Sequence, residues 1–166
     1  MAVLEILVYP DPRLAHASQS VPAFDKNLHK FIEDLEETMH AGPGGVGIAA
    51  PQVDVLQRIV IVDVSGKPKV SSHGRLILIN PQIVANGGGL VGREGCMSVP
   101  DYTGNVVRAK TIQVVAYDEF GERQEYACEG YEARVIQHEI DHLDGLLFLD
   151  RLVSRRRDLF RRKTYA

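Results

Sequence analysis

Residues 131–143 read YEARVIQHEIDHL and contain neither glycine nor proline. Apolar side chains such as Val135 and Ile140 leave this stretch little polar surface, so it predicts a buried α-helix. His138 and His142 lie one helical turn apart, about 40° around the axis, and both imidazoles can therefore bind one metal ion from the same side. We expect this helix to lie at the centre of the fold and to carry the chemistry of the protein.

Glu139 lies beside the two histidines in the pattern HExxH. A carboxylate in this position can accept a proton from water activated by a metal ion without being a ligand itself, as in metal-dependent hydrolases. The alternative interpretation is a core helix with two unrelated histidines, and the intervening glutamate counts against it. A catalytic site of this kind also needs a third protein ligand and an open position for water.

The position of the third ligand distinguishes between families of HExxH proteins. The longer protease pattern HExxHxxGxxH is matched as far as Gly145, but Phe148 stands at its last ligand position. No glutamate follows His142, so the ligand is expected upstream. Cys96, within the segment EGCMS, is the natural candidate because a thiolate binds divalent metals strongly. Cys128 has no such context and is interpreted as a small buried hydrophobic residue.

A glycine-rich segment, GVGIAAPQ, occupies residues 45–52. It lacks the Lys-Ser or Lys-Thr pair of a phosphate-binding loop. Its glycines allow the backbone to come close to a ligand, and Gln52 supplies a side-chain amide that can donate a hydrogen bond. A tight turn is the alternative interpretation of this segment.

An N-terminal amphipathic helix is predicted after Asp25, a suitable N-cap, because apolar residues recur there at helical spacing while charged residues take the opposite face. Gly42 and Pro43 are expected to end this helix. The stretches at residues 58–64 and 76–80 are rich in Ile and Val and predict strands.

The segment between these strands, residues 65–74, is polar and predicts a loop. Residues 111–118 and 123–127, joined at Phe120 and Gly121, predict a β-hairpin. Because the strands lie mostly between the two helices rather than alternating with them, the predicted fold class is α+β and not a doubly wound parallel sheet.

The chain has 166 residues, 45% hydrophobic and 25% charged, so residues 1–166 are expected to form a single domain with one core. A formal net charge of −3 argues against DNA binding and membrane-surface binding through a global positive field. No run approaches the roughly 18 apolar residues of a membrane span, and the N-terminus does not resemble a secretion signal. With only two cysteines, a disulfide framework is excluded and a cytoplasmic location is expected.

Basic residues gather in the C-terminal segment 151–166, which contains RRR at residues 155–157 and RRK at residues 161–163. One interpretation is a solvated helix face. The other is a transient contact with ribosomal RNA or protein, where local positive charge would meet phosphate groups.

Three segments together resemble the motifs of peptide deformylases, GφGφAAPQ (φ is an apolar residue), EGCxS and QHExDHLxG. In this chain they read, in the same order, GVGIAAPQ, EGCMS and QHEIDHLDG. YPDPRL at residues 9–14 and the pair Asn80-Pro81 also resemble family features, so the resemblance covers about residues 4–152. Met97 stands where many members carry Leu, a replacement of similar volume.

This resemblance implies mixed or antiparallel sheets around the HExxH helix. It also implies the activity, which is removal of the formyl group from the N-terminal formylmethionine of newly synthesised polypeptides. One divalent metal ion would be held by Cys96, His138 and His142. The resemblance implies ferrous iron in the cell, and zinc, nickel or cobalt also suit these ligands.

The resemblance further implies that Glu139 is the acid–base group and that the Gln52 amide and the Met97 backbone N–H stabilise the oxyanion. The glycine-rich strand edge would pair with the substrate backbone by β-augmentation, and an apolar pocket would receive the methionine side chain. The substrate-binding residues predicted in this way are Gly45, Val46, Gly47, Glu94, Gly95, Tyr131 and Val135.

Two other functional classes remain open at this point. A metalloprotease would cleave internal peptide bonds, but Phe148 leaves its ligand set incomplete. A non-catalytic metal-binding domain normally offers four protein ligands, whereas three are identified here and Glu139 would have no task. Assays on formylated and unformylated peptides would separate the deformylase from the protease.

Overall fold

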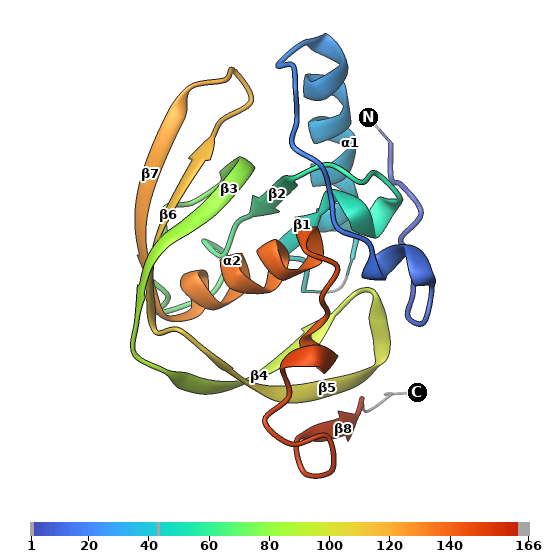
Figure 1. Ribbon diagram of the computed structural model, residues 1–166, viewed down its shortest axis with the longest axis vertical. Coiled ribbons are helices and arrows are strands. Elements are labelled where there is room, and N and C mark those ends of the chain that lie inside the picture. The colour runs from blue at the N-terminus through green and yellow to red at the C-terminus, as the bar shows by residue number, and fades with distance from the viewer. Residues whose placement is uncertain (1, 43, 163–166) are drawn as a thin grey trace.

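Helix α2, Gly130–Leu143, lies in the middle of the molecule with strands around it (Figure 1). The computed structural model describes residues 2–42 and 44–162, and its other α-helix, α1, spans Lys26–Ala41. The strands are β1 Gly47–Ala49, β2 Ile59–Val62, β3 Leu76–Gly87, β4 Leu90–Cys96, β5 Val99–Arg108, β6 Thr111–Tyr117, β7 Arg123–Glu129 and β8 Leu159–Arg161. Short 3-10 helices span Pro12–Ala15 (η1), Ala50–Val53 (η2) and Phe148–Arg151 (η3). The predicted α+β class is confirmed.

The strands form two sheets in which every pairing between strands is antiparallel. The larger sheet has the order β1-β2-β3-β6-β7, so the short strand β1 lies at an edge. The smaller sheet has the order β4-β5-β8 and lies below α2 in the view of Figure 1. Helix α2 therefore has the larger sheet on one side and the smaller sheet on another.

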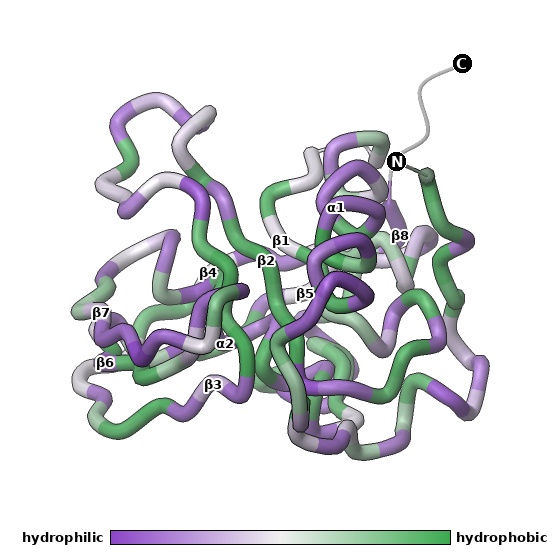
Figure 2. Tube along the Cα trace, turned by 90° about the horizontal axis from the view of Figure 1, so that it is seen from above, coloured by the Kyte–Doolittle hydropathy of each residue, from purple (hydrophilic) through white to green (hydrophobic). Residues whose placement is uncertain are grey.

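Strand β2 is buried on both faces, which explains its uninterrupted apolar sequence IVIV. Successive side chains of a strand point to opposite faces. Val60 and Val62 join a buried cluster with residues of α2, whereas Ile59 and Ile61 join a cluster with residues of α1. Figure 2 shows hydrophobic residues in green along β2 and many hydrophilic residues in purple on α1. The two helices thus cover opposite faces of the larger sheet.

Helix α1 begins after Asp25, whose side chain accepts a hydrogen bond of 3.0 Å from the Leu28 backbone N–H. Its buried residues recur at helical spacing and are Leu28, Ile32, Leu35, Thr38 and Met39. The helix ends at Ala41 with Gly42 as its C-cap, and Pro43 lies outside the described residues. None of the helices in the described ranges is both long enough and apolar enough to cross a bilayer.

Strand β3 is longer than predicted, because it continues past Pro81 to Gly87. The pairing with β6 shifts register between Ile79 and Gln82, and such an irregularity accommodates a proline that cannot donate to the sheet. The Asn80 side chain accepts a hydrogen bond of 2.8 Å from the Val21 backbone N–H. The predicted strand end at residue 80 therefore lies at a bulge within a longer strand.

Strands β4 and β5 were not predicted, and they form most of the smaller sheet. Their sequences, LVGREGC and VPDYTGNVVR, contain glycines and a proline and show no clear apolar alternation. The glycines permit close contacts between elements. A Cβ atom added at Gly92 would lie 2.8 Å from Cζ of Arg134, which crosses the strand there. These positions serve tertiary packing, which a local pattern does not reveal.

The expectation of a helix face in the basic segment 151–166 is wrong for the residues that the structure describes. Residues 155–157 form an exposed turn, and the short strand β8 follows. Phe160 pairs with Thr103 of β5, so an available sheet edge holds this segment in an extended conformation. Residues 163–166 lie outside the described residues.

Candidate active site

Cys96, His138 and His142 come together from two elements. Both histidines project from α2, and Cys96 ends β4 just before the tight turn to β5. All three residues are buried. The Cys96 Sγ atom lies 3.4 Å from Nε2 of His142, and one potential ligand atom from each residue lies within 4.8 Å of the others.

This geometry fits one divalent metal ion. Tetrahedral coordination with metal–sulfur and metal–nitrogen distances of about 2.3 and 2.0 Å separates the two ligand atoms by about 3.5 Å, close to the 3.4 Å between Cys96 and His142. A set of one thiolate and two imidazoles suits zinc, iron, nickel or cobalt and leaves a fourth position open. In addition, Oε1 of Glu139 is buried without a hydrogen-bond partner among the described residues.

The orientation of His138 is set by Glu94. The Nδ1–H group of His138 donates to Oε1 of Glu94 at 2.9 Å, which directs the other ring nitrogen, Nε2, away from this carboxylate as a ligand. Arg108 donates two hydrogen bonds of 2.9 Å to Glu94, and Arg134 donates one of 2.7 Å. Burial would raise the pKa of Glu94, but the hydrogen bonds and charges of His138 and Arg108 lower it to about 2. Glu94 is therefore ionised at neutral pH and buried with its counterions.

Asp141 extends this network of charges. It accepts hydrogen bonds from Arg108 at 2.5 Å and from Arg151 at 3.1 Å. Asp141 and Arg134 lie three residues after and four residues before His138, so helical spacing could have indicated both of them. Arg108 belongs to β5 and has no such local signal. Sequence reasoning missed all three residues, and it assigned Glu94 to the substrate rather than to His138.

Glu139 is buried beside His138 and His142. Its Oε1 atom lies 3.7 Å from Nε2 of His142. Burial raises the pKa of Glu139 to about 7, so this carboxyl group can hold or release a proton near neutral pH. Strand β1 passes close to it, because a Cβ atom added at Gly47 would lie 2.6 Å from Oε2 of Glu139. Glycine is thus the residue that fits where the edge strand crosses Glu139.

The two histidines differ in their protonation tendencies. Burial lowers the pKa of His142 well below its ordinary value, which favours the neutral ring that metal coordination requires. Burial would also lower the pKa of His138, but its hydrogen bonds with Cys96 and Glu94 raise it well above the ordinary value.

The Gln52 side chain is fixed with its amide nitrogen toward Cys96. Its Oε1 atom accepts a hydrogen bond of 2.9 Å from the Ala49 backbone N–H, and its Nε2 atom donates to Ser98 Oγ at 3.0 Å. The same nitrogen lies 3.5 Å from Cys96 Sγ. Met97, the next residue after Cys96, lies in the turn between β4 and β5.

A cleft of about 560 Å³ opens over these groups. His142 does not line it and lies buried behind Cys96. Arg93 and Arg162, which sequence reasoning did not assign to the site, also line the cleft. The predicted residues that line it are Gly45, Val46, Gly47, Gln52, Glu94, Gly95, Cys96, Met97, Tyr131, Val135, His138 and Glu139. Motifs far apart in the sequence therefore meet around one cavity.

Comparison with known proteins gives a consistent result. The family described as polypeptide deformylase matches residues 3–158. A peptide deformylase of Syntrophobacter fumaroxidans is 44% identical over 163 residues, which are 98% of this chain and 94% of the relative.

Solved structures agree in fold as well as in sequence. A peptide deformylase from Legionella pneumophila superimposes with a TM-score of 0.85 at 40% identity, covering 94% of this chain and 89% of the other. One from Ehrlichia chaffeensis, in complex with actinonin, gives a TM-score of 0.87 at 38% identity and covers 95% and 92% of the two chains. The chain belongs to the peptide deformylase family and is a hydrolase.

Proposed function

We propose that this protein is a metal-dependent deformylase that removes the formyl group from the N-terminal formylmethionine of newly synthesised polypeptides. The observation that carries the proposal is the buried group of Cys96, His138 and His142, with Glu139 beside it, at a cleft bordered by an open strand edge. We further propose that residues 1–166 act as one catalytic domain in the cytoplasm, where formylated chains are made.

Cys96, His138 and His142 would hold one divalent ion, ferrous iron in the cell, with zinc, nickel or cobalt as alternatives that suit the same ligands. When bound, such an ion lowers the pKa of water and polarises a carbonyl group. Glu94 keeps His138 in the tautomer that ligation needs through their 2.9 Å hydrogen bond. Arg108 and Arg134 in turn hold Glu94.

Glu139 is the proposed general base and acid. It takes a proton from the water that attacks the formyl carbon and later delivers it to the departing amine. Burial raises its pKa toward the working pH, where a group that both accepts and delivers a proton is most effective. The breaking bond joins the formyl carbon to the methionine nitrogen, and the products are formate and a free N-terminus.

Gln52 and Met97 are the proposed donors to the oxyanion that develops on the formyl oxygen. The Gln52 amide needs no reorganisation, because its oxygen is already held by the Ala49 backbone and its nitrogen faces the site. The Met97 backbone N–H would donate from the turn that follows Cys96.

The substrate backbone would pair with the chain around β1, at Gly45 and Gly47. Strand β1 lies at the edge of its sheet, and main-chain pairing gives affinity with little dependence on the peptide sequence. Val46, Tyr131, Val135 and the ring of His138 form the proposed walls of the methionine pocket, and Gly95, which lines the same cleft, is a further proposed substrate contact.

The basic turn at residues 155–157 is the proposed transient contact with the ribosome, since all three of its arginines are exposed. Replacing Arg155, Arg156 and Arg157 by serine removes the exposed charge and leaves the residues of β8 unchanged. Reduced co-sedimentation with ribosomes at low salt, with unchanged cleavage of free peptides, would support the contact. Equal co-sedimentation of variant and parent would contradict it.

The proposed activity is tested by kcat/KM for three tripeptides, with mass spectrometry of the products. Formyl-Met-Ala-Ser should be cleaved efficiently, formyl-Ala-Ala-Ser poorly and acetyl-Met-Ala-Ser hardly at all. The methyl group of acetyl must enter space bounded by the backbone of residues 45–52 and makes the carbonyl less electrophilic. A hydrophobic pocket discriminates by about 1 to 3 kcal/mol per methylene. Similar rates for formyl and acetyl substrates, or any internal cleavage, would exclude the deformylase and favour a protease.

A further inference from the structure

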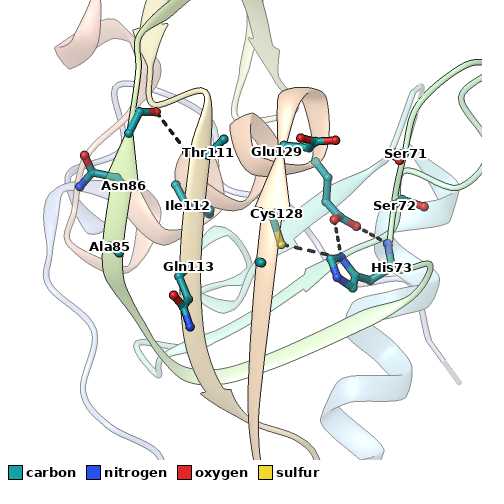
Figure 3. Close-up of a pocket in the computed structure, with 13 residues that line it drawn as sticks. Ser71, Ser72, His73, Ala85, Asn86, Thr111, Ile112, Gln113, Cys128 and Glu129 are labelled. Carbon is teal, nitrogen blue, oxygen red and sulfur yellow. Dashed lines mark hydrogen bonds and ion pairs between the residues drawn. The ribbon is translucent and has the colours of Figure 1, made fainter.

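A second group of metal-ligating side chains lies outside the cleft, at His73, Cys128 and Glu132. His73 comes from the loop before β3, Cys128 from β7 and Glu132 from the first turn of α2. Nδ1 of His73 lies 2.6 Å from Oε1 of Glu132 and 3.8 Å from Sγ of Cys128. Figure 3 shows the His73 ring and the Cys128 sulfur facing one another beside β7.

Glu132 has an unusual environment for a carboxylate. Only 2% of the residue is exposed, and the hydrogen bonds that it accepts within the described ranges come from the backbone N–H and the ring of His73. No lysine or arginine side chain of the described residues forms an ion pair with it. A buried carboxylate needs a close positive partner. The N-terminus of α2 offers partial positive charge, and the His73 ring at 2.6 Å is a cation only when it is protonated. A bound metal ion would supply the positive charge when the ring is neutral.

Cys128 supplies the sulfur of this group. The thiol is buried, and burial together with the charge of Glu132 raises its pKa to about 12. A metal ion would therefore have to displace a proton to bind this sulfur, and metal binding that releases protons is weakened accordingly. Affinity at this group is expected to be lower than at Cys96.

The group borders a cavity of about 520 Å³. The His73 side chain is 38% exposed, so an ion can reach the group and water can complete its coordination. Polar side chains line the same cavity, including Asn86, Thr111 and Gln113 (Figure 3). The combination is a thiol, an imidazole and a carboxylate at a solvent-accessible hollow.

We infer that His73, Cys128 and Glu132 form a second site for a divalent transition-metal ion of the zinc class. The sulfur–nitrogen distance of 3.8 Å is close to the roughly 3.5 Å expected in a tetrahedral zinc site. The nitrogen–oxygen distance of 2.6 Å is that of a hydrogen bond, and it must open to about 3.4 Å around zinc. His73 lies on a loop, residues 65–74, which can make this small movement. The bound ion would fasten that loop to the helix that carries the catalytic residues.

Cobalt(II) binding to the full chain tests this site, because a cobalt–thiolate bond produces a charge-transfer absorption band. The titration uses the variant Cys96→Ala as its starting protein, because the cleft of this variant offers no thiolate. This variant should develop a cobalt–thiolate band. The matched variant Cys96→Ala/Cys128→Ser should show no such band, and adding Glu132→Gln to Cys96→Ala should weaken cobalt binding at least tenfold. Absence of the band in a folded Cys96→Ala protein, judged by circular dichroism, would overturn the proposal.

Zinc stoichiometry gives an independent measurement that does not depend on deformylase activity. Equilibrium dialysis should give two zinc ions per native chain and one per chain for Cys128→Ser, which should keep full cleavage of formyl-Met-Ala-Ser. One zinc ion per chain in both proteins would refute the second site while leaving the proposed function intact. Two ions per chain in a protein without deformylase activity would refute only the proposed function.

Discussion

Within the part of the chain that the structure describes, a cysteine and a histidine lie close enough to bind one metal ion in two clusters, and these differ in how firmly their side chains are held. Cys96 and its two histidines sit on a strand end and a helix, with Glu94 fixing one ring through a network of buried charges. His73 sits on a loop and is partly exposed. Similar ligand types can thus be held rigidly, as at the proposed catalytic centre, or on a segment that can adjust, as at His73.

The surroundings of the two clusters differ as well. Glu139 and the Gln52 amide stand next to Cys96 and its histidines, at a cleft with an open strand edge. Glu132, by contrast, is itself one of the three groups of the second cluster. Glu139 is the proposed general base, is not itself a ligand, and would make hydrolysis possible at the first cluster. At the second cluster, binding of a metal ion is expected to stabilise the folded protein rather than to catalyse a reaction.

The largest difference is expected when each cysteine is removed in turn. Cys96→Ala should abolish tight metal binding and deformylation, because only two imidazoles remain at the centre. Cys128→Ala should leave both properties of the cleft intact, since this sulfur lies in another cavity. Metal analysis after dialysis, combined with kcat/KM, measures the contrast. A Cys96→Ala/Cys128→Ser protein, which lacks both thiols, that still kept one ion at the parent's affinity would show that the third ligand of the cleft has been misassigned.

Removal of the base should have the next largest effect. Glu139→Gln should retain its metal ion but lose on the order of 10² to 10⁴ in rate, the usual contribution of a general acid–base group. Single-turnover kinetics and metal content are the measurements. Glu132→Gln is the matched control on the same helix, and its kcat should stay within about twofold of the parent. A loss below tenfold for Glu139→Gln would point to another base.

A smaller effect is expected from the carboxylate behind His138. Glu94→Gln cannot hold the ring through a charged hydrogen bond, and loss of such a partner typically costs 10- to 100-fold in metal affinity. Competition with a chelator of known affinity measures the change. The variant also leaves Arg108 and Arg134 without their shared counterion, so circular dichroism must accompany the titration. Unchanged affinity in a folded variant would contradict the positioning role of Glu94.

These expectations rest on features that sequence could predict to different degrees. The HExxH spacing and the Asp25 cap act within one helix each, so their geometry follows from local rules. Cys96 was reached by excluding Phe148 as a ligand and by the family motifs. Arg108 could not be predicted, because its contacts with Glu94 and Asp141 arise only when β5 packs beside α2.

The smaller sheet was missed for a related physical reason. Strands β4 and β5 contain Gly92, Pro100 and Gly104, and these residues lower strand propensity while permitting close contacts with Arg134 and with η3. The group of His73, Cys128 and Glu132 escaped notice as well, because its members lie on three separate segments with no common spacing. Local periodicity predicts individual helices and strands. The smaller sheet and the group of His73, Cys128 and Glu132 depend on contacts between elements, which periodicity does not predict.

The smallest effect should come from His73, which tests whether the second cluster matters for stability alone. His73→Ala removes the ring that hydrogen-bonds Glu132 at 2.6 Å and leaves the carboxylate buried with only the backbone N–H as a partner. Loss of a hydrogen bond to a charged group costs about 1.5 to 3 kcal/mol, and urea unfolding in the presence of a chelator measures this in the absence of metal. Cleavage of formyl-Met-Ala-Ser should stay within about twofold of the parent, because His73 borders a different cavity from the cleft.

Adding zinc should raise the unfolding midpoint of Cys96→Ala more than that of Cys96→Ala/His73→Ala, since only the former keeps three ligands at the second cluster. If His73→Ala slowed deformylation tenfold without changing the unfolding midpoint, the two clusters would be coupled through α2, and the separation between a catalytic and a stabilising cluster would fail.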